Sequence, residues 1–159
     1  MDTPAWLKIA FAEAGVRGHT DGSSNPRVEA YHRSVGSGWR DSVPWCSSFL
    51  NWCMQRAGVE GTHSALARSW LAWGVQLEVP RYGCVVVLWR DQPDCERGHV
   101  GLFLRQDDEY VFLFGGNQLG EVREHFYPRR MVLGYRWAVG PGVYRSGPSV
   151  PEKIPVLGK

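Results

Sequence analysis

Residues 42–53, "SVPWCSSFLNWC", have the pattern of an apolar helix that carries a cysteine near its start and a second cysteine seven residues later. Asp41 or Ser42 can cap this helix, Pro44 suits its first turn, and Gly58 ends it. The apolar side chains recur at helical spacing, which predicts that most of the helix is buried: Cys46, Phe49, Leu50, Cys53, Met54 and Ala57, with Trp45 and Trp52 beside them.

The two cysteines of this helix differ in their position. A free cysteine on an apolar stripe usually packs as a small hydrophobe, and this is the interpretation for Cys53. Cys46 lies in the first turn, where unpaired backbone N–H groups and the helix dipole favour negative charge and can lower a thiol pKa from about 8.5. Position alone leaves two interpretations of Cys46 open, a buried filler and a reactive nucleophile.

Composition predicts one domain without an obvious charged partner. A chain of 159 residues with 43% hydrophobic residues can bury a real core. Its 18 basic and 16 acidic residues nearly balance, which does not favour nucleic-acid binding. The N-terminus, "MDTPAWLKIAFAEAG", lacks the basic and apolar regions of a signal peptide, and no apolar run approaches the roughly 20 residues of a membrane span. We therefore expect synthesis in the cytoplasm and no membrane insertion.

The remaining cysteines, Cys84 and Cys95, have no CxxC partner. A cytoplasmic origin favours free thiols. Together with His99 they form only a poor zinc pattern, because short-spaced ligand pairs are missing. We expect no metal ion and no other cofactor.

Helical patterns fill the first half of the chain and strand patterns the second, which predicts an α+β fold with helices packed on an antiparallel sheet. Two further helices are expected, over 4–14 with Gly15 as the stop, and over 26–34 after Asn25 as the cap. Residues 140–159 hold four prolines and four glycines and are typical of an extended tail or linker. The predicted domain therefore spans residues 1–139.

Residues 98–118 read as a hairpin that closes around the acidic turn at residues 107–109. A three-residue loop sets the facing pairs Leu102 and Phe114, Leu104 and Phe112, and Gly101 and Gly115. His99 and Asn117 then lie opposite each other at the open end, on one face of the hairpin. A two-residue loop would direct them to opposite faces.

A histidine held by an amide side chain is one half of the machinery of a cysteine hydrolase, in which imidazole takes the thiol proton and the amide sets its tautomer. Cys46 would supply the thiol. Taken singly, His99 could be an ordinary strand-end histidine, and Asn117 suits a turn after two glycines. The joint occurrence of all three favours catalysis.

Four segments carry a resemblance to a known family: "VPWCSSFLNWCMQRAG", "SALARSWLAWG", "GHVGLFL" and "GGNQ". Together they resemble the CHAP-type and NlpC-like cysteine peptidoglycan hydrolases, most of all the compact single-domain group among phage and bacterial lysis proteins. The similarity runs from about residue 3 to 138. It implies a reduced papain-like fold, with Cys46 as nucleophile, His99 as general base and then acid, and Asn117 as the orienting residue.

This chain departs from the resemblance where relatives commonly show Gly-Asp before the histidine strand. Here the pair is Gly83-Cys84. Cys95, in "PDCERGH", is also unusual. Formation of a disulfide between Cys84 and Cys95 remains an alternative to free thiols for a protein that reaches an oxidising compartment.

The resemblance implies that the substrate is an amide bond of peptidoglycan, either between the sugar lactyl group and L-alanine or within the stem peptide. Aromatic faces suit sugars and peptides, so four side chains are either groove walls or core: Tyr31, Trp45, Trp70 and Trp73. Arg68 or Arg27 could pair with a stem carboxylate, or either could be an ordinary surface arginine.

A cell-wall hydrolase without a signal peptide needs a delivery route. A holin-made membrane lesion at the end of a phage cycle would release an endolysin, and a bacterial secretion apparatus would inject an antibacterial effector. An immunity or inhibitor protein is a further possible partner, and we expect a monomer. Two other functions remain open: a non-catalytic module that binds murein or an inhibitor, and a cysteine protease or acyltransferase that acts on protein.

Overall fold

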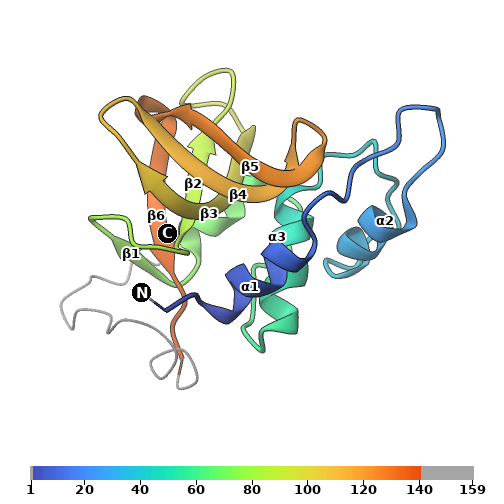
Figure 1. Cartoon of the computed structure of the whole chain (residues 1–159), viewed down its shortest axis with the longest axis horizontal. Helices are drawn as coiled ribbons and strands as arrows, with labels where there is room; N and C mark the ends of the chain where they lie inside the picture. The colour runs from blue at the N-terminus through green and yellow to red at the C-terminus, as the bar shows by residue number, and fades with distance from the viewer. Residues whose placement is uncertain (1, 141–159) are drawn as a thin grey trace.

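The protein combines a layer of helices with an antiparallel sheet. In a computed structural model, which describes residues 2–140, three α-helices precede a six-stranded sheet (Figure 1). The helices lie together on one side of the curved sheet. The predicted α+β class is confirmed.

The helices are α1 (Ala5–Ala12), α2 (Pro26–Arg33) and α3 (Cys46–Arg56). Pro4 caps α1, and Gly15 takes a positive φ of 93° just beyond its end, a conformation that favours glycine. Asn25 caps α2 as predicted, because its Oδ1 accepts the Arg27 N–H at 2.9 Å.

The start of α3 differs from the prediction. Trp45 is its N-cap residue, no side chain caps it, and Cys46 is its first residue. The expected cap at Asp41 or Ser42 is wrong. The Asp41 carboxylate instead accepts the N–H groups of His19 and Asn25, each at 2.7 Å, and thereby holds the loop before α2.

The sheet has the strand order β1-β6-β2-β3-β4-β5, and all its pairs are antiparallel. Its strands are β1 (Val75–Leu77), β2 (Val85–Trp89), β3 (Gly98–Gln106), β4 (Tyr110–Gln118), β5 (Glu121–Pro128) and β6 (Val132–Trp137). Two short 3₁₀ helices, η1 (Ala67–Ala72) and η2 (Arg129–Met131), interrupt the connections. The predicted "SALARSWLAWG" segment thus contains η1, which packs on β2, β3 and β6.

Helix α3 is the centre of the core. It packs on α1 and α2 and on strands β3 and β4, and every residue from Cys46 to Met54 is buried. Cys53 has no exposed surface, and burial raises its pKa well above that of an ordinary thiol. Burial also raises the pKa of Cys84 to about 12. The interpretation of Cys53 as packing is confirmed.

The β3–β4 hairpin closes at residues 107–109 as predicted, with the Asp107 N–H donating to the Tyr110 carbonyl at 3.0 Å. Leu102 faces Phe114, which confirms the predicted register at that point. The predicted pairing of Leu104 with Phe112 is wrong, because a bulge between Phe103 and Arg105 leaves Leu104 as the extra residue and sets Arg105 opposite Phe112.

Within residues 2–140, no helix is long and apolar enough to cross a membrane. The predicted tail at 140–159 lies, from residue 141 onward, outside the described residues.

Candidate active site

Two elements bring a thiol and an imidazole into contact. Cys46 opens α3, and His99 is the second residue of β3. Each shifts the pKa of the other, and both are nearly buried, with 5% and 7% of their surface exposed. The structure therefore brings together the two residues that the sequence proposed as nucleophile and base.

The surroundings of Cys46 favour the thiolate. Burial raises the pKa of the thiol, but the charge of His99, its hydrogen bond, and the N–H groups of Val100 and Ser47 act in the opposite direction. The net result is a pKa below that of an ordinary cysteine. In His99, burial lowers the pKa, while Cys46 and then Gln118 raise it, and the net shift is upward. The pair therefore tends toward a thiolate beside an imidazolium.

The amide that binds His99 belongs to Gln118 and not to Asn117. His99 Nε2 lies 2.9 Å from Gln118 Oε1. The prediction that Asn117 holds the imidazole is corrected, although Asn117 lines a hollow beside His99. Gln118 was missed even though it is the next residue of the quoted "GGNQ" segment.

A bulge in β4 explains this correction. Gly115 pairs with Arg123 of β5 but Gln118 pairs with Glu121, so Gly116 and Asn117 together stand opposite Val122. Asn117 has a positive φ of 57°. An extra residue in one strand shifts the alternation of side chains by one position. Gln118 consequently takes the place that a regular strand would give to Asn117.

The contacts of Gln118 define the tautomer of His99. Gln118 Nε2 donates to the carbonyls of Leu113 at 3.1 Å and Arg123 at 2.6 Å, so Oε1 is the atom that faces His99. Because that oxygen can only accept, His99 Nε2 carries the proton and Nδ1 is left for the thiol. The Tyr127 hydroxyl also donates to Gln118 Oε1, at 3.1 Å.

Glycines allow these elements to approach closely. A Cβ added at Gly116 would lie 2.7 Å from the Cβ of Phe49 on α3. Cβ atoms at Gly101 and Gly115 would each lie 3.4 Å from Gln118 Oε1, and the one at Gly101 would lie 3.1 Å from Leu113. The missing side chains thus leave room for α3 on the bulge and for the Gln118 amide between the strands.

Two hollows flank the thiol–imidazole pair. A larger one, of about 400 Å³, includes Cys46, and its other lining residues are Pro44, Ala65, Leu66, Ala67, Arg90, Glu96, Arg97 and Gly98. A smaller one, of about 200 Å³, includes His99, with Leu88, Trp89, Arg90, Asn117, Leu119, His125, Tyr127 and Met131. Arg90 lines both hollows, so they adjoin at this residue, with Cys46 on one and His99 on the other. The two hollows together are called the groove, and each is one of its arms.

Buried polar contacts hold one wall of the larger hollow. Ser47 Oγ donates to the Ser64 carbonyl at 2.6 Å and accepts from Trp70 Nε1 at 2.8 Å. Asn51 Nδ2 donates to the same Ser64 carbonyl, at 3.1 Å. The residues that follow, Ala65 to Ala67, line the hollow, so α3 positions both the thiol and this wall.

Arg68 holds the opposite wall. Its guanidinium donates to the carbonyls of Gln92, Pro93 and Arg97, at 3.3, 3.1 and 3.0 Å. Its predicted pairing with a substrate carboxylate is therefore corrected to a structural contact. Arg27 is also engaged, because it forms two hydrogen bonds with the Glu13 carboxylate, at 2.7 and 2.8 Å.

The aromatic residues expected as groove walls belong to the core. Tyr31, Trp45 and Trp70 have 1% of their surface exposed or less. Trp73 is partly buried against the core, and its Nε1 donates to the Glu60 carbonyl at 2.8 Å. None of the four lines either hollow. Helical spacing predicted burial but could not say which aromatic rings border the groove.

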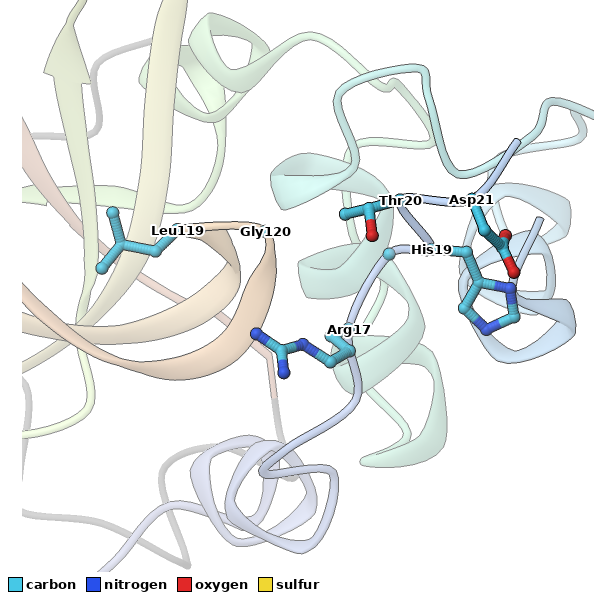
Figure 2. A pocket seen from close by; sticks show the side chains of 7 residues that line it. Arg17, His19, Thr20, Asp21, Leu119 and Gly120 are labelled. Atoms are coloured by element: carbon cyan, nitrogen blue, oxygen red, sulfur yellow. The ribbon is translucent and has the colours of Figure 1, made fainter. Parts of the chain in front are cut away.

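A third hollow, of about 450 Å³, adjoins the smaller arm through Leu119. It lies between the loop of Arg17 to Asp21 and the turn of Leu119 and Gly120 (Figure 2). The Arg17 side chain points toward that turn, while His19 and Asp21 lie on the far side of the loop. Leu119 has a φ of 55° and is 66% exposed, which is unusual for a leucine.

Cys84 and Cys95 are both free. Cys84 is buried just before β2, and Cys95 lies in the loop after β2, where its thiol donates to the Arg90 carbonyl at 2.8 Å. Opposite ends of a strand are too far apart for a disulfide, so that possibility is excluded in this fold. Among the described residues, no group of three or more His, Cys, Asp or Glu side chains could hold a metal ion.

Comparison with known proteins places the fold. No family model matches the chain, and no curated protein matches it. The fold is similar to the crystal structure of a Staphylococcus aureus protein described as similar to a lipoprotein of the NLP/P60 family, with a TM-score of 0.50 and 13% sequence identity. The match covers 86% of this chain but 41% of that protein, so this chain spans less than half of its length. The chain has the papain-like α+β fold of NlpC/P60 proteins.

Proposed function

We propose that this chain is a cysteine amidohydrolase that cleaves an amide bond of peptidoglycan. The observation that carries the proposal is the pairing of Cys46 with His99 where two hollows adjoin, with the thiol pKa lowered by the imidazole. A thiol buried for packing alone has a raised pKa, as Cys53 does. The NlpC/P60-like fold supports the same reaction class.

The reaction begins when the Cys46 thiolate attacks the amide carbonyl. A bond forms between sulfur and carbon, and the carbonyl oxygen gains negative charge that the N–H groups at the start of α3 can stabilise. His99 then donates its proton to the nitrogen as the C–N bond breaks, which leaves a thioester and a free amine. Water attacks the thioester carbonyl while His99 takes its proton, and the C–S bond then breaks, which releases the carboxylic acid and restores the thiol. Gln118 keeps the imidazole oriented throughout.

The choice of peptidoglycan comes from the quoted sequence segments and their resemblance to CHAP-type and NlpC-like hydrolases. The proposed bond lies at the lactyl–L-alanine junction or within the stem peptide. An endolysin released through a holin lesion and an effector delivered by a secretion apparatus both suit this activity at the cell wall.

The first test compares purified murein incubated with wild type, Cys46→Ala and Cys53→Ala, with released fragments measured by mass spectrometry. Wild type should release fragments and Cys46→Ala should release none, because it lacks the nucleophile. Cys53→Ala removes a thiol from the same helix and should keep the activity, although it leaves a small cavity and lowers the melting temperature. The fragment masses identify the bond that is cut.

Equal release by wild type and Cys46→Ala would contradict the assignment of the nucleophile. No release by either protein would favour a binding module or a protein substrate instead. Thiol labelling gives an independent measurement: at pH 7, iodoacetamide should modify Cys46 faster than Cys53, since only the Cys46 pKa is lowered. The advantage of Cys46 should disappear in His99→Ala, and faster labelling of Cys53 would contradict the proposed activation.

A further inference from the structure

Arg90 stands where the two arms of the groove meet. It directly follows β2, whose Leu88 pairs with His99, and it lines both the hollow that contains Cys46 and the hollow that contains His99. Its position makes it a neighbour of whatever group lies beside the reacting amide.

The backbone of Arg90 is held firmly. Its carbonyl accepts the N–H of Gln92 at 2.7 Å and the thiol of Cys95 at 2.8 Å. Arg68 binds three further carbonyls of the same loop. The loop thus fixes the place from which the Arg90 side chain extends.

The Arg90 guanidinium is exposed and uncommitted. Within residues 2–140 it makes no hydrogen bond or ion pair, whereas its neighbour Arg97 pairs with Asp91 at 3.5 Å. His125, which lines the smaller hollow, has a pKa lowered by burial and by the charges of Arg123 and His99, so it is neutral at pH 7. Arg90 is consequently a permanent positive charge, without an acidic partner among residues 2–140, where the two arms adjoin.

We propose that Arg90 forms a carboxylate-binding subsite beside the reacting amide, so that the preferred substrate carries a free carboxylate next to the bond that is cut. The guanidinium fork matches a carboxylate in a bidentate manner. Apolar side chains of the smaller hollow, Leu88, Trp89 and Met131, suit the short alkyl part of such a group. Glu96, on the larger hollow, would repel a doubly charged phosphate more than a single carboxylate.

This inference deepens the proposed function and rests on it for the substrate, but the subsite can be tested without cleavage. Iodoacetate and iodoacetamide alkylate the same thiolate: the Cys46 sulfur bonds to the CH₂ carbon and iodide leaves. The two reagents differ in that only iodoacetate carries a carboxylate. Their rate ratio at Cys46, followed by mass spectrometry, therefore reports binding of a carboxylate and cancels changes in thiolate content.

The ratio of iodoacetate to iodoacetamide rates should fall about threefold in Arg90→Gln, as expected for the loss of one exposed ion pair. Arg33→Gln removes an equal charge from the exposed surface of α2 and should leave the ratio unchanged. An unchanged ratio in Arg90→Gln, or an equal fall in Arg33→Gln, would overturn the subsite.

Murein stem peptides then test the substrate. Wild type should cleave a peptide with a free carboxylate beside the cut bond at least about tenfold faster, as kcat/KM, than the matched carboxamide, and Arg90→Gln should cleave both at similar rates. Equal cleavage of both peptides by wild type would overturn the substrate preference. If wild type cleaves neither peptide nor murein, the proposed function fails, while the alkylation ratio still decides whether Arg90 binds carboxylates.

Discussion

Gln118 uses both ends of its side-chain amide. Its nitrogen donates to two backbone carbonyls, and its oxygen accepts from His99 and Tyr127. This arrangement allows the amide only one orientation. A rotated amide would place its NH₂ group against the His99 N–H, and its oxygen against the two backbone carbonyls that now accept from it. A residue without charge thereby sets the tautomer of the base.

Gln118→Ala should lower kcat at least about tenfold, since the imidazole loses the contact that orients it. It should also move the alkaline limit of activity to lower pH. The pKa of His99 falls through burial and rises through Cys46 and Gln118, so removal of Gln118 leaves a lower pKa and the imidazolium is lost sooner as the pH rises. A pH profile of kcat, with the melting temperature as a check on folding, measures both effects.

Asn117→Gly is the comparison variant, because glycine tolerates the positive φ at this position. It should lose less activity than Gln118→Ala and keep the wild-type pH profile. A larger loss of activity in Asn117→Gly than in Gln118→Ala would show that Asn117 orients the imidazole.

The active site depends on how three elements meet. Helix α3 supplies the thiol, β3 supplies the imidazole, and the bulged end of β4 supplies the amide. The bulge lies against α3 at Phe49, where Gly116 permits contact between backbone and side chain. Displacement of α3 from β4 would therefore separate the thiol from the residue that orients its base.

Gly116→Ala should destabilise the protein by about 1–3 kcal/mol, because the new Cβ would meet the Phe49 Cβ at 2.7 Å. Activity should fall more than the loss of folded protein explains. Gly38→Ala is the matched control, since a Cβ there meets nothing within 4 Å and its φ is not positive. Chemical denaturation and kcat/KM measured together test this prediction, and equal behaviour of the two variants would contradict it.

At the scale of the molecule, one ionic cluster joins the helical layer. Glu13, at the end of α1, accepts two hydrogen bonds from Arg27 and one from Tyr31 of α2, the latter at 2.6 Å. The Arg27 guanidinium also lies over the ring of Trp52 on α3, 4.9 Å from its centre. All three helices are thus tied together away from the groove.

Glu13→Gln should lower the free energy of unfolding at pH 7 by about 2 kcal/mol, because charged hydrogen bonds are lost. The hydrogen bond from Arg27 is the main cause of the lowered Glu13 pKa, against an opposing effect of burial. A carboxyl with a lower pKa in the folded state stabilises the protein above its ordinary pKa of 4.5, and this contribution disappears as the pH falls through the folded-state pKa. The difference in free energy of unfolding between wild type and the variant should therefore shrink below pH 4.5, as measured by chemical denaturation at several pH values. A difference that persists unchanged in acid would contradict this account.

Local patterns in the sequence determined the α+β class, the three-residue turn of the hairpin and the difference between Cys46 and Cys53. These features depend on periodicity, turn residues and position within one helix, which neighbouring residues establish. The Asn25 cap and the pairing of Leu102 with Phe114 belong to the same group.

Tertiary structure alone decided which amide meets His99, which aromatic residues are core, and that Arg90 rather than Arg27 or Arg68 lines both hollows. The bulge at Gly116 and Asn117 arises where β4 packs between β5 and α3, and a shift of one residue there exchanges Asn117 for Gln118. Arg27 and Arg68 are engaged by groups 14 to 29 residues away in the chain, while Arg90 is left exposed. Such contacts depend on side chains that meet only after the helices have packed on the sheet, so no local pattern could have shown them.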